Sequence, residues 1–178
     1  MRQPREWQER AFKEIDAALD FYNKTKETAI INNIAAVGAG KTDVASYAFA
    51  NFILENFEEK TFQAFICPRI SLCKDQIDSI KEFLIDYGIK EGSFDVVEIN
   101  CKSESTTKKL DPKNYKHIIA VYCDKSFWEE SDNKWAATKS TLKNFLKNNF
   151  KFGFNNFDEA HNYEKSFDKI LDRKKYQI

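Results

Sequence analysis

The segment that most constrains the fold of this 178-residue chain is Ala35–Thr42, which reads Ala-Ala-Val-Gly-Ala-Gly-Lys-Thr. It follows an apolar stretch and opens a segment with helical spacing. Gly38 and Gly40 carry no Cβ, so the backbone around them can approach an anion closely. The order of strand, glycine-rich turn, Lys-Thr and helix therefore predicts a phosphate-binding loop, although Ala35 stands where the usual eight-residue pattern has its first glycine.

Each residue of this loop has an expected role. The backbone N–H groups of Gly38, Ala39 and Gly40 face the anion at the positive end of a helix dipole. The Lys41 side chain reaches the β- and γ-phosphates of a nucleotide, and the Thr42 hydroxyl ligates Mg²⁺. The alternative interpretation is an ordinary glycine turn before a helix, which the strand–helix frame disfavours.

A second polar group lies far downstream, where Asp158-Glu159-Ala160-His161 follows a segment rich in phenylalanine. Two adjacent carboxylates after an apolar strand suit metal-assisted phosphoryl transfer. Asp158 is expected to hold Mg²⁺, directly or through water, and Glu159 to polarise the attacking water. Taken alone, a short acidic stretch is equally consistent with a solvated loop, so the upstream loop is what favours the catalytic interpretation.

Apolar periodicity predicts helices that alternate with strands. The expected helices are 4–23, 42–57, 71–87, 140–149 and 163–172, and the expected strands are 29–36, 62–67, 94–99, 117–122 and 152–157. This alternation predicts an α/β fold, a three-layer α/β/α sandwich with a mainly parallel sheet, and residues 101–114 are expected to form a polar loop. Because Asn155 and Asn156 interrupt the last strand, we expect it to be distorted or to lie near the edge of the sheet.

The two motifs together resemble motifs I and II of superfamily 2 helicases and translocases, which are P-loop NTPases with a RecA-like fold. Within these proteins the chain is most similar to the group of restriction-enzyme helicase subunits and UvrB-like proteins. The resemblance implies ATP and Mg²⁺ as cofactors, with Lys41, Asp158 and Glu159 as catalytic residues. It also implies that His161 couples the ATP site to motif III.

Three shorter segments resemble further motifs of these helicases. Arg5-Glu6-Trp7-Gln8 is similar to the Arg-x-x-Gln signature upstream of motif I, which assigns Gln8, beside Arg5, to recognition of the adenine edge. A segment that includes Pro68 and Arg69, with Gln76 behind it, resembles motif Ia and implies contact with the nucleic-acid backbone. The matches to motif Ic, which also implies nucleic-acid contact, are Tyr122 and Ser126. For motifs Ia and Ic, a buried strand followed by a helix cap is an equally good interpretation.

The resemblance implies that residues 1–178 form one helicase ATP-binding domain, the first RecA-like domain, and that the chain stops before motif III. A second RecA-like domain, in the same or another chain, would supply the arginine fingers. We therefore expect the isolated chain to bind ATP–Mg²⁺ weakly and to hydrolyse it negligibly. The nucleic-acid partner is DNA, or alternatively RNA.

Composition excludes some classes of protein but does not itself indicate a function. Lysine plus arginine and aspartate plus glutamate both total 28, so net charge does not predict nucleic-acid binding, and lysine clusters at 108–116 and 139–151 are either local binding patches or solvated faces. The longest apolar runs have strand length, which predicts no membrane-spanning segment. The four cysteines lack Cys-x-x-Cys spacing, so we expect reduced thiols in an intracellular, cytoplasmic protein, with the nucleus or a virion as alternatives.

Three hypotheses for function remain open from the sequence. The first is the ATP-binding N-terminal domain of a superfamily 2 DNA helicase or translocase, or of an RNA helicase. The second is a non-catalytic module that binds a nucleotide or nucleic acid. The third is an unrelated P-loop kinase or ATPase, against which the Asp-Glu-Ala-His segment argues.

Overall fold

The computed structural model describes residues 3–27, 29, 31, 35–36, 38–99, 115–123 and 148–159. Three α-helices, one 3₁₀ turn and four strands have their bounds within these residues, and residues 148–149 are also helical. In chain order these are α1 Glu6–Thr25, α2 Lys41–Glu55, β1 Thr61–Cys67, η1 Ile70–Leu72, α3 Cys73–Asp86, β2 Phe94–Ile99, β3 His117–Cys123 and β4 Lys151–Phe157. None of the helices in this part of the chain has the length and apolar character that a bilayer crossing requires.

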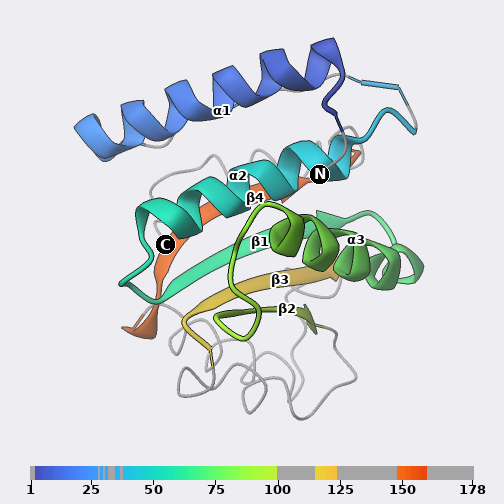
Figure 1. The fold of residues 1–178 in the computed structure, drawn as a ribbon. Coiled ribbons are helices and arrows are strands. Elements are labelled where there is room, and N and C mark those ends of the chain that lie inside the picture. The colour runs from blue at the N-terminus through green and yellow to red at the C-terminus, as the bar shows by residue number, and fades with distance from the viewer. Residues whose placement is uncertain are drawn as a thin grey trace, which may run out of the picture.

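The four strands form one parallel sheet in the order β2-β3-β1-β4. The two central strands, β1 and β3, are buried along their whole length, as expected for parallel strands that are covered on both faces. Figure 1 shows α2 and α3 side by side over one face of this sheet. The α/β fold with a parallel sheet that the sequence predicts is therefore confirmed.

Strand β4 lies at the edge of the described sheet and contains an irregularity. Its pairing with β1 slips by one residue between Phe62 and Ala64 of β1. A Cβ at Gly153, within this stretch of β4, would come within 2.6 Å of the Phe52 ring of α2, so a side chain there would force the strand away from the helix. Asn155 is exposed. The register slip confirms the expected distortion of this strand, and within the described residues the strand lies at the edge of the sheet.

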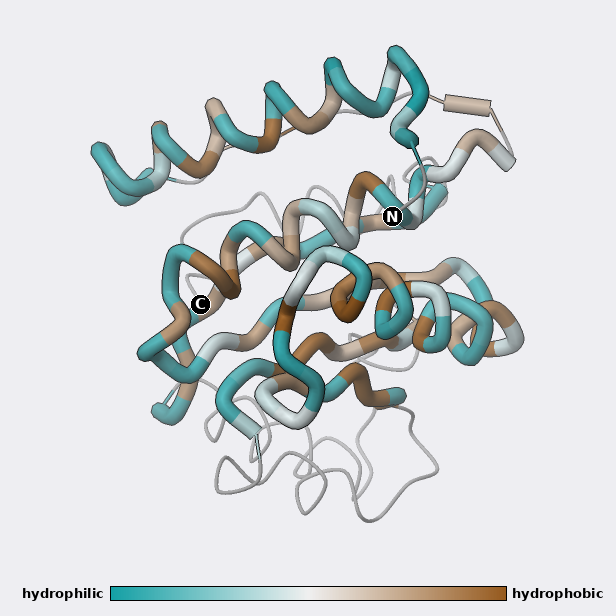
Figure 2. The backbone as a smooth tube through the Cα atoms, in the orientation of Figure 1, coloured by the Kyte–Doolittle hydropathy of each residue, from teal (hydrophilic) through white to brown (hydrophobic). Residues whose placement is uncertain are grey.

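Apolar side chains divide into clusters on either side of the sheet and a third cluster beneath α1. One cluster joins α2 and α3 to the sheet through Phe49, Ile53, Phe65 and Ile80, which are at most 1% exposed. The opposite face of the sheet contributes a second cluster. Helix α1 lies over α2 and packs Ala11, Ile15 and Leu19 against it. Figure 2 shows the matching pattern, with hydrophobic positions at intervals along an otherwise hydrophilic α1.

A polar seam fixes α1 on α2. The Tyr47 hydroxyl and the Asn51 amide, both on α2, donate hydrogen bonds to the Asp16 carboxylate of α1 at 3.0–3.1 Å. The Tyr47 ring also stacks on Phe12, with the ring centroids 3.9 Å apart. Burial raises the pKa of Tyr47 to about 12, so the hydroxyl stays protonated and remains a donor over the physiological pH range.

Element boundaries follow the sequence-based expectations within a few residues, with one difference. Helix α1 runs over Glu6–Thr25 where 4–23 was expected, and β2 has the expected bounds. Of the strand expected over 29–36, the structure describes residues 29, 31, 35 and 36, and none of these four is in a strand. The helix expected at 163–172, most of that at 140–149 and the loop at 101–114 lie outside the described residues.

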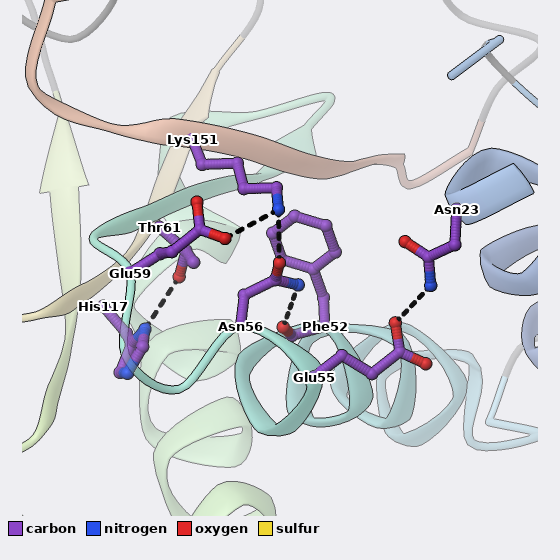
Figure 3. A network of polar contacts seen from close by, with 8 residues as sticks. All are labelled: Asn23, Phe52, Glu55, Asn56, Glu59, Thr61, His117 and Lys151. Atoms are coloured by element: carbon purple, nitrogen blue, oxygen red, sulfur yellow. Dashed lines mark hydrogen bonds and ion pairs between the residues drawn. The ribbon is translucent and has the colours of Figure 1, made fainter. Parts of the chain in front are cut away.

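A polar network, buried at Thr61 and His117 and partly exposed at Lys151 and Glu59, closes the amino end of the sheet (Figure 3). The Thr61 hydroxyl and His117 Nδ1 lie 2.9 Å apart at the first residues of two neighbouring strands, and both side chains belong to residues with no exposed surface. Nearby, Lys151 Nζ donates to Asn56 Oδ1 at 2.6 Å and to Glu59 Oε1 at 2.9 Å. These contacts tie the loop after α2 to the starts of three strands.

Candidate functional site

The loop before α2 has the backbone that the phosphate-loop pattern requires. Gly38 and Gly40 have φ angles of +73° and +89°, in the left-handed region that side chains disfavour. Gly40 is also confined in space, because a Cβ there would lie 2.7 Å from Gln8 Nε2 and 3.1 Å from Asp43 Oδ2. Gly40 is the cap residue of α2, so the loop delivers the chain directly to a helix N-terminus.

Lys41 meets the downstream carboxylates at this helix start. Its Nζ lies 2.7 Å from Glu159 Oε1, in an ion pair whose two side chains are 29% and 32% exposed. The two residues are 118 positions apart in the chain. Asp158 and Glu159 directly follow β4, and the Asp158 N–H donates to the Ile66 carbonyl at 2.9 Å, which continues the β1–β4 pairing. The fold thus gathers motif I and motif II at the carboxyl end of the sheet, where ligands bind in open α/β folds.

Asp158 and Glu159 are each held in an unfavourable way, Asp158 in its charge and Glu159 in its backbone conformation. Burial raises the pKa of Asp158, the Lys41 charge opposes this shift, and the Glu159 charge adds to it. Glu159 has a φ of +55°, which is uncommon for a residue with a Cβ. Backbone strain and a disfavoured charge that coincide at one turn are typical of functional sites.

Thr42 makes a contact that the sequence motifs did not assign. Its Oγ1 donates to Gln76 Oε1 at 2.7 Å, which links the first turn of α2 to α3. Gln76 was noted in the sequence only as part of the motif Ia match. The signal for it was the spacing behind Pro68, but nothing in the sequence places it beside the phosphate loop.

Gln8 is buried and its amide is used within the chain. Its Nε2 donates to the Gly40 carbonyl at 3.1 Å and to Asp43 Oδ2 at 3.3 Å, while its Oε1 accepts from the Arg5 N–H at 2.9 Å. Arg5 Nη1 reaches the Gly38 carbonyl at 3.3 Å. Both residues therefore hold α1 against the phosphate loop. Asp43, which sequence reasoning missed, completes this set of contacts.

The chain matches one protein-family model, described as Type III restriction enzyme, res subunit, over residues 2–178. The chain belongs to this family. Membership confirms the resemblance to the first RecA-like domain of superfamily 2 helicases and implies nucleotide binding in general. Comparison with curated proteins finds no match.

A solved structure gives the fold independently. It is described as the structure of a nuclease-deletion mutant of the Type ISP restriction-modification enzyme LlaGI in complex with a DNA substrate mimic. The alignment has a TM-score of 0.55 and 13% sequence identity, and it covers 89% of this chain and 17% of the enzyme's chain. The chain thus spans about a sixth of that protein's length. The structural alignment supports the RecA-like fold of this chain.

The residues matched to motifs Ia and Ic fall in two environments. Arg69 is exposed and lies just before η1, and Pro68 precedes it as a half-buried residue. Tyr122 is only 4% exposed and packs in the apolar cluster on the sheet face opposite α2 and α3, so its ring is not available to a nucleic acid in this arrangement. Ser126 and His161 lie outside the described residues.

Three of the four cysteines are described, all three are buried, and none of them forms a disulfide within the described part of the chain. Cys67 and Cys123 end β1 and β3 as directly paired neighbours, and Cys73 opens α3. Among the described residues, no group of three or more His, Cys, Asp or Glu side chains is arranged to hold a metal ion by itself.

Proposed function

We propose that this chain is the ATP-binding N-terminal domain of a superfamily 2 DNA helicase or translocase, with residues 1–178 as one domain. The observation that carries the proposal is the 2.7 Å contact between Lys41 Nζ and Glu159 Oε1. This contact joins the phosphate loop to the acidic turn after β4. Hydrolysis of a nucleoside triphosphate requires the loop to hold the phosphates and the carboxylates to place metal and water. The alternative of a P-loop kinase has less support. Asp158 and Glu159 directly follow a strand and begin an Asp-Glu-Ala-His segment, as motif II of the helicases does.

The residues at this site fit ATP and Mg²⁺ in type and position. Gly38, Ala39 and Gly40 supply N–H groups at a helix start, and Lys41 supplies the cation for the β- and γ-phosphates. Thr42 and Asp158 are the metal ligands. Because Mg²⁺ is commonly held by one or two protein ligands together with substrate phosphates, the lack of a larger acidic cluster among the described residues is consistent with this site. When bound, Mg²⁺ neutralises charge on the phosphates.

Glu159 is the residue we assign to orientation of the attacking water. In the structure its carboxylate forms an ion pair with Lys41. Binding of a triphosphate gives Lys41 a stronger partner and releases the Glu159 carboxylate toward the site. The Lys41–Glu159 pair is therefore a contact that nucleotide exchanges, and its partial exposure makes the exchange inexpensive.

DNA is the proposed nucleic-acid partner. The support is the neighbouring structure, whose title describes a complex with a DNA substrate mimic, and the exposed Arg69 at the end of β1. Arg69 lies at the same carboxyl end of the sheet as the phosphate loop.

A second RecA-like domain, in the same or another chain, is proposed to complete the ATP site with an arginine finger. Such a finger is worth about 10³–10⁵ in rate where it has been measured.

The test is phosphate release by the purified chain, alone and with a separately supplied second RecA-like domain of this family, each with and without DNA. We expect negligible turnover by the chain alone and DNA-stimulated turnover by the combination, abolished by Glu159→Gln. Nucleotide binding without turnover in any combination indicates the non-catalytic module instead. Stimulation by RNA but not DNA indicates an RNA helicase domain.

A further inference from the structure

The Thr42 hydroxyl, one of the two proposed metal ligands, is hydrogen-bonded to a second side chain that can set its orientation. A threonine hydroxyl has one hydrogen to donate and two lone pairs to offer. Here the hydrogen is directed to Gln76 Oε1 at 2.7 Å, from the first turn of α2 to the second turn of α3. With the hydrogen placed there, both lone pairs of Oγ1 remain available to a cation.

Gln76 is well supported for such a role. It lies on α3, which is anchored on the sheet by Cys73, Ile80 and Leu84, all at most 1% exposed. Its own side chain is half-buried. A hydrogen-bond acceptor on an anchored helix holds its partner more closely than a water molecule or a loop residue can.

A rotating Thr42 hydroxyl would have other acceptors. In the first turn of a helix, threonine hydroxyls commonly donate to a backbone carbonyl about one turn earlier, which turns the oxygen away from a ligand beside the helix start. The Gln76 carbonyl oxygen competes with that arrangement.

We propose that Gln76 is a positioning residue for the metal ion of this site: it orients the Thr42 hydroxyl so that Oγ1 coordinates Mg²⁺ bound with a nucleotide. This inference rests on the proposed function and deepens it. It assigns to α3, whose amino end adjoins Arg69, an indirect role in the metal half of the nucleotide site, through Thr42. Gln76 touches neither the nucleotide nor the metal in this account.

The experiment measures the metal-dependent part of nucleotide affinity. A non-hydrolysable β,γ-imido analogue of ATP is titrated into the chain by calorimetry, once with Mg²⁺ and once with EDTA. The variants are Gln76→Leu, which removes the acceptor, and Gln76→Glu, which keeps it. Ser79→Ala, an exposed change one turn further along α3, is the matched control. Thermal unfolding of each variant verifies that the fold is intact.

We expect Gln76→Leu to reduce the affinity gain from Mg²⁺ about two- to tenfold, the range for the loss of one hydrogen bond, and to leave the affinity in EDTA unchanged. Ser79→Ala should keep the wild-type gain, and Gln76→Glu, which keeps the acceptor and adds a negative charge near the metal, should keep or increase it. An unchanged gain in Gln76→Leu overturns the role of Gln76, as does an equal loss with and without Mg²⁺. A wild-type chain that binds no analogue under either condition overturns the proposed function itself.

Discussion

The two ends of the parallel sheet both carry polar side chains, yet they differ in how those side chains are satisfied. At the amino end, the Thr61 hydroxyl and the His117 imidazole form a neutral pair with no exposed surface. At the carboxyl end, Lys41 and Glu159 form a charged pair that is about one third exposed. The first pair is sealed in the fold, whereas the second is the pair that we propose a nucleotide replaces.

This difference identifies the functional end better than polarity does. Both ends show perturbed titration, since burial lowers the pKa of His117 to about 4 and raises the pKa of Asp158. Two described non-glycine residues have a positive φ: Lys26, which caps the C-terminus of α1, and Glu159, which forms an ion pair with Lys41 beside the glycine loop at the carboxyl end. Glu159 combines a strained backbone with a partly exposed ion pair, and this combination is typical of a functional site.

The largest expected effect at the amino end is a loss of stability in acid that depends on His117. Because its pKa is about 4 when folded and near 6.5 when unfolded, the unfolded chain takes up the proton first as pH falls. Between pH 7 and pH 4, wild type should lose about 3 kcal/mol of unfolding free energy more than His117→Asn, which cannot titrate. Denaturant titrations at both pH values measure this. Parallel losses in the two proteins would contradict a sealed neutral pair.

At the carboxyl end, breaking the charged pair should increase nucleotide affinity. Glu159→Gln frees Lys41 and removes a negative charge beside the phosphate loop, so we expect ATP to bind about fivefold more tightly, equivalent to about 1 kcal/mol for a partly exposed pair. The matched control is Glu59→Gln, which breaks the Lys151 ion pair at the amino end and should leave affinity unchanged. Weaker binding by Glu159→Gln would argue against an exchangeable pair.

The smallest effect concerns the cost of the buried carboxylate. The pKa of Asp158 is raised in the folded state, so its charged form opposes folding at neutral pH. Asp158→Asn should raise the melting temperature at pH 7, and the difference from wild type should shrink as pH falls toward the ordinary carboxyl range. Scanning calorimetry over this pH range measures the trend. A lower melting temperature for Asp158→Asn at pH 7 would show that its charge stabilises the fold.

Much of this architecture is predictable from local sequence. Strand β2 has its expected bounds, and the distortion of strand β4 follows from Asn155 and Asn156. The phosphate loop follows from Gly38 and Gly40, because few other residues adopt their backbone angles. These features depend on one segment at a time, and so local pattern is enough to find them.

The remaining features depend on how distant segments pack. Nothing in the sequence places Gln76 against Thr42 or Asp43 against Gln8, because those contacts need α3 and α1 to be docked on α2. Tyr122 was matched to a nucleic-acid motif, but β3 is buried on both faces and takes the ring into the core. Strands of this kind lack the alternation that would tell an inward side chain from an outward one.

The central claim is that the carboxyl end of the sheet binds nucleotide phosphates through Lys41, and one calorimetric comparison tests it. ATP–Mg²⁺ is titrated into wild type, Lys41→Ala and Lys151→Ala, two lysines that both form ion pairs but at opposite ends of the sheet. We predict that Lys41→Ala weakens binding about 10- to 100-fold, as expected for loss of a charged phosphate contact, while Lys151→Ala binds like wild type. Equal affinity of wild type and Lys41→Ala would contradict the account.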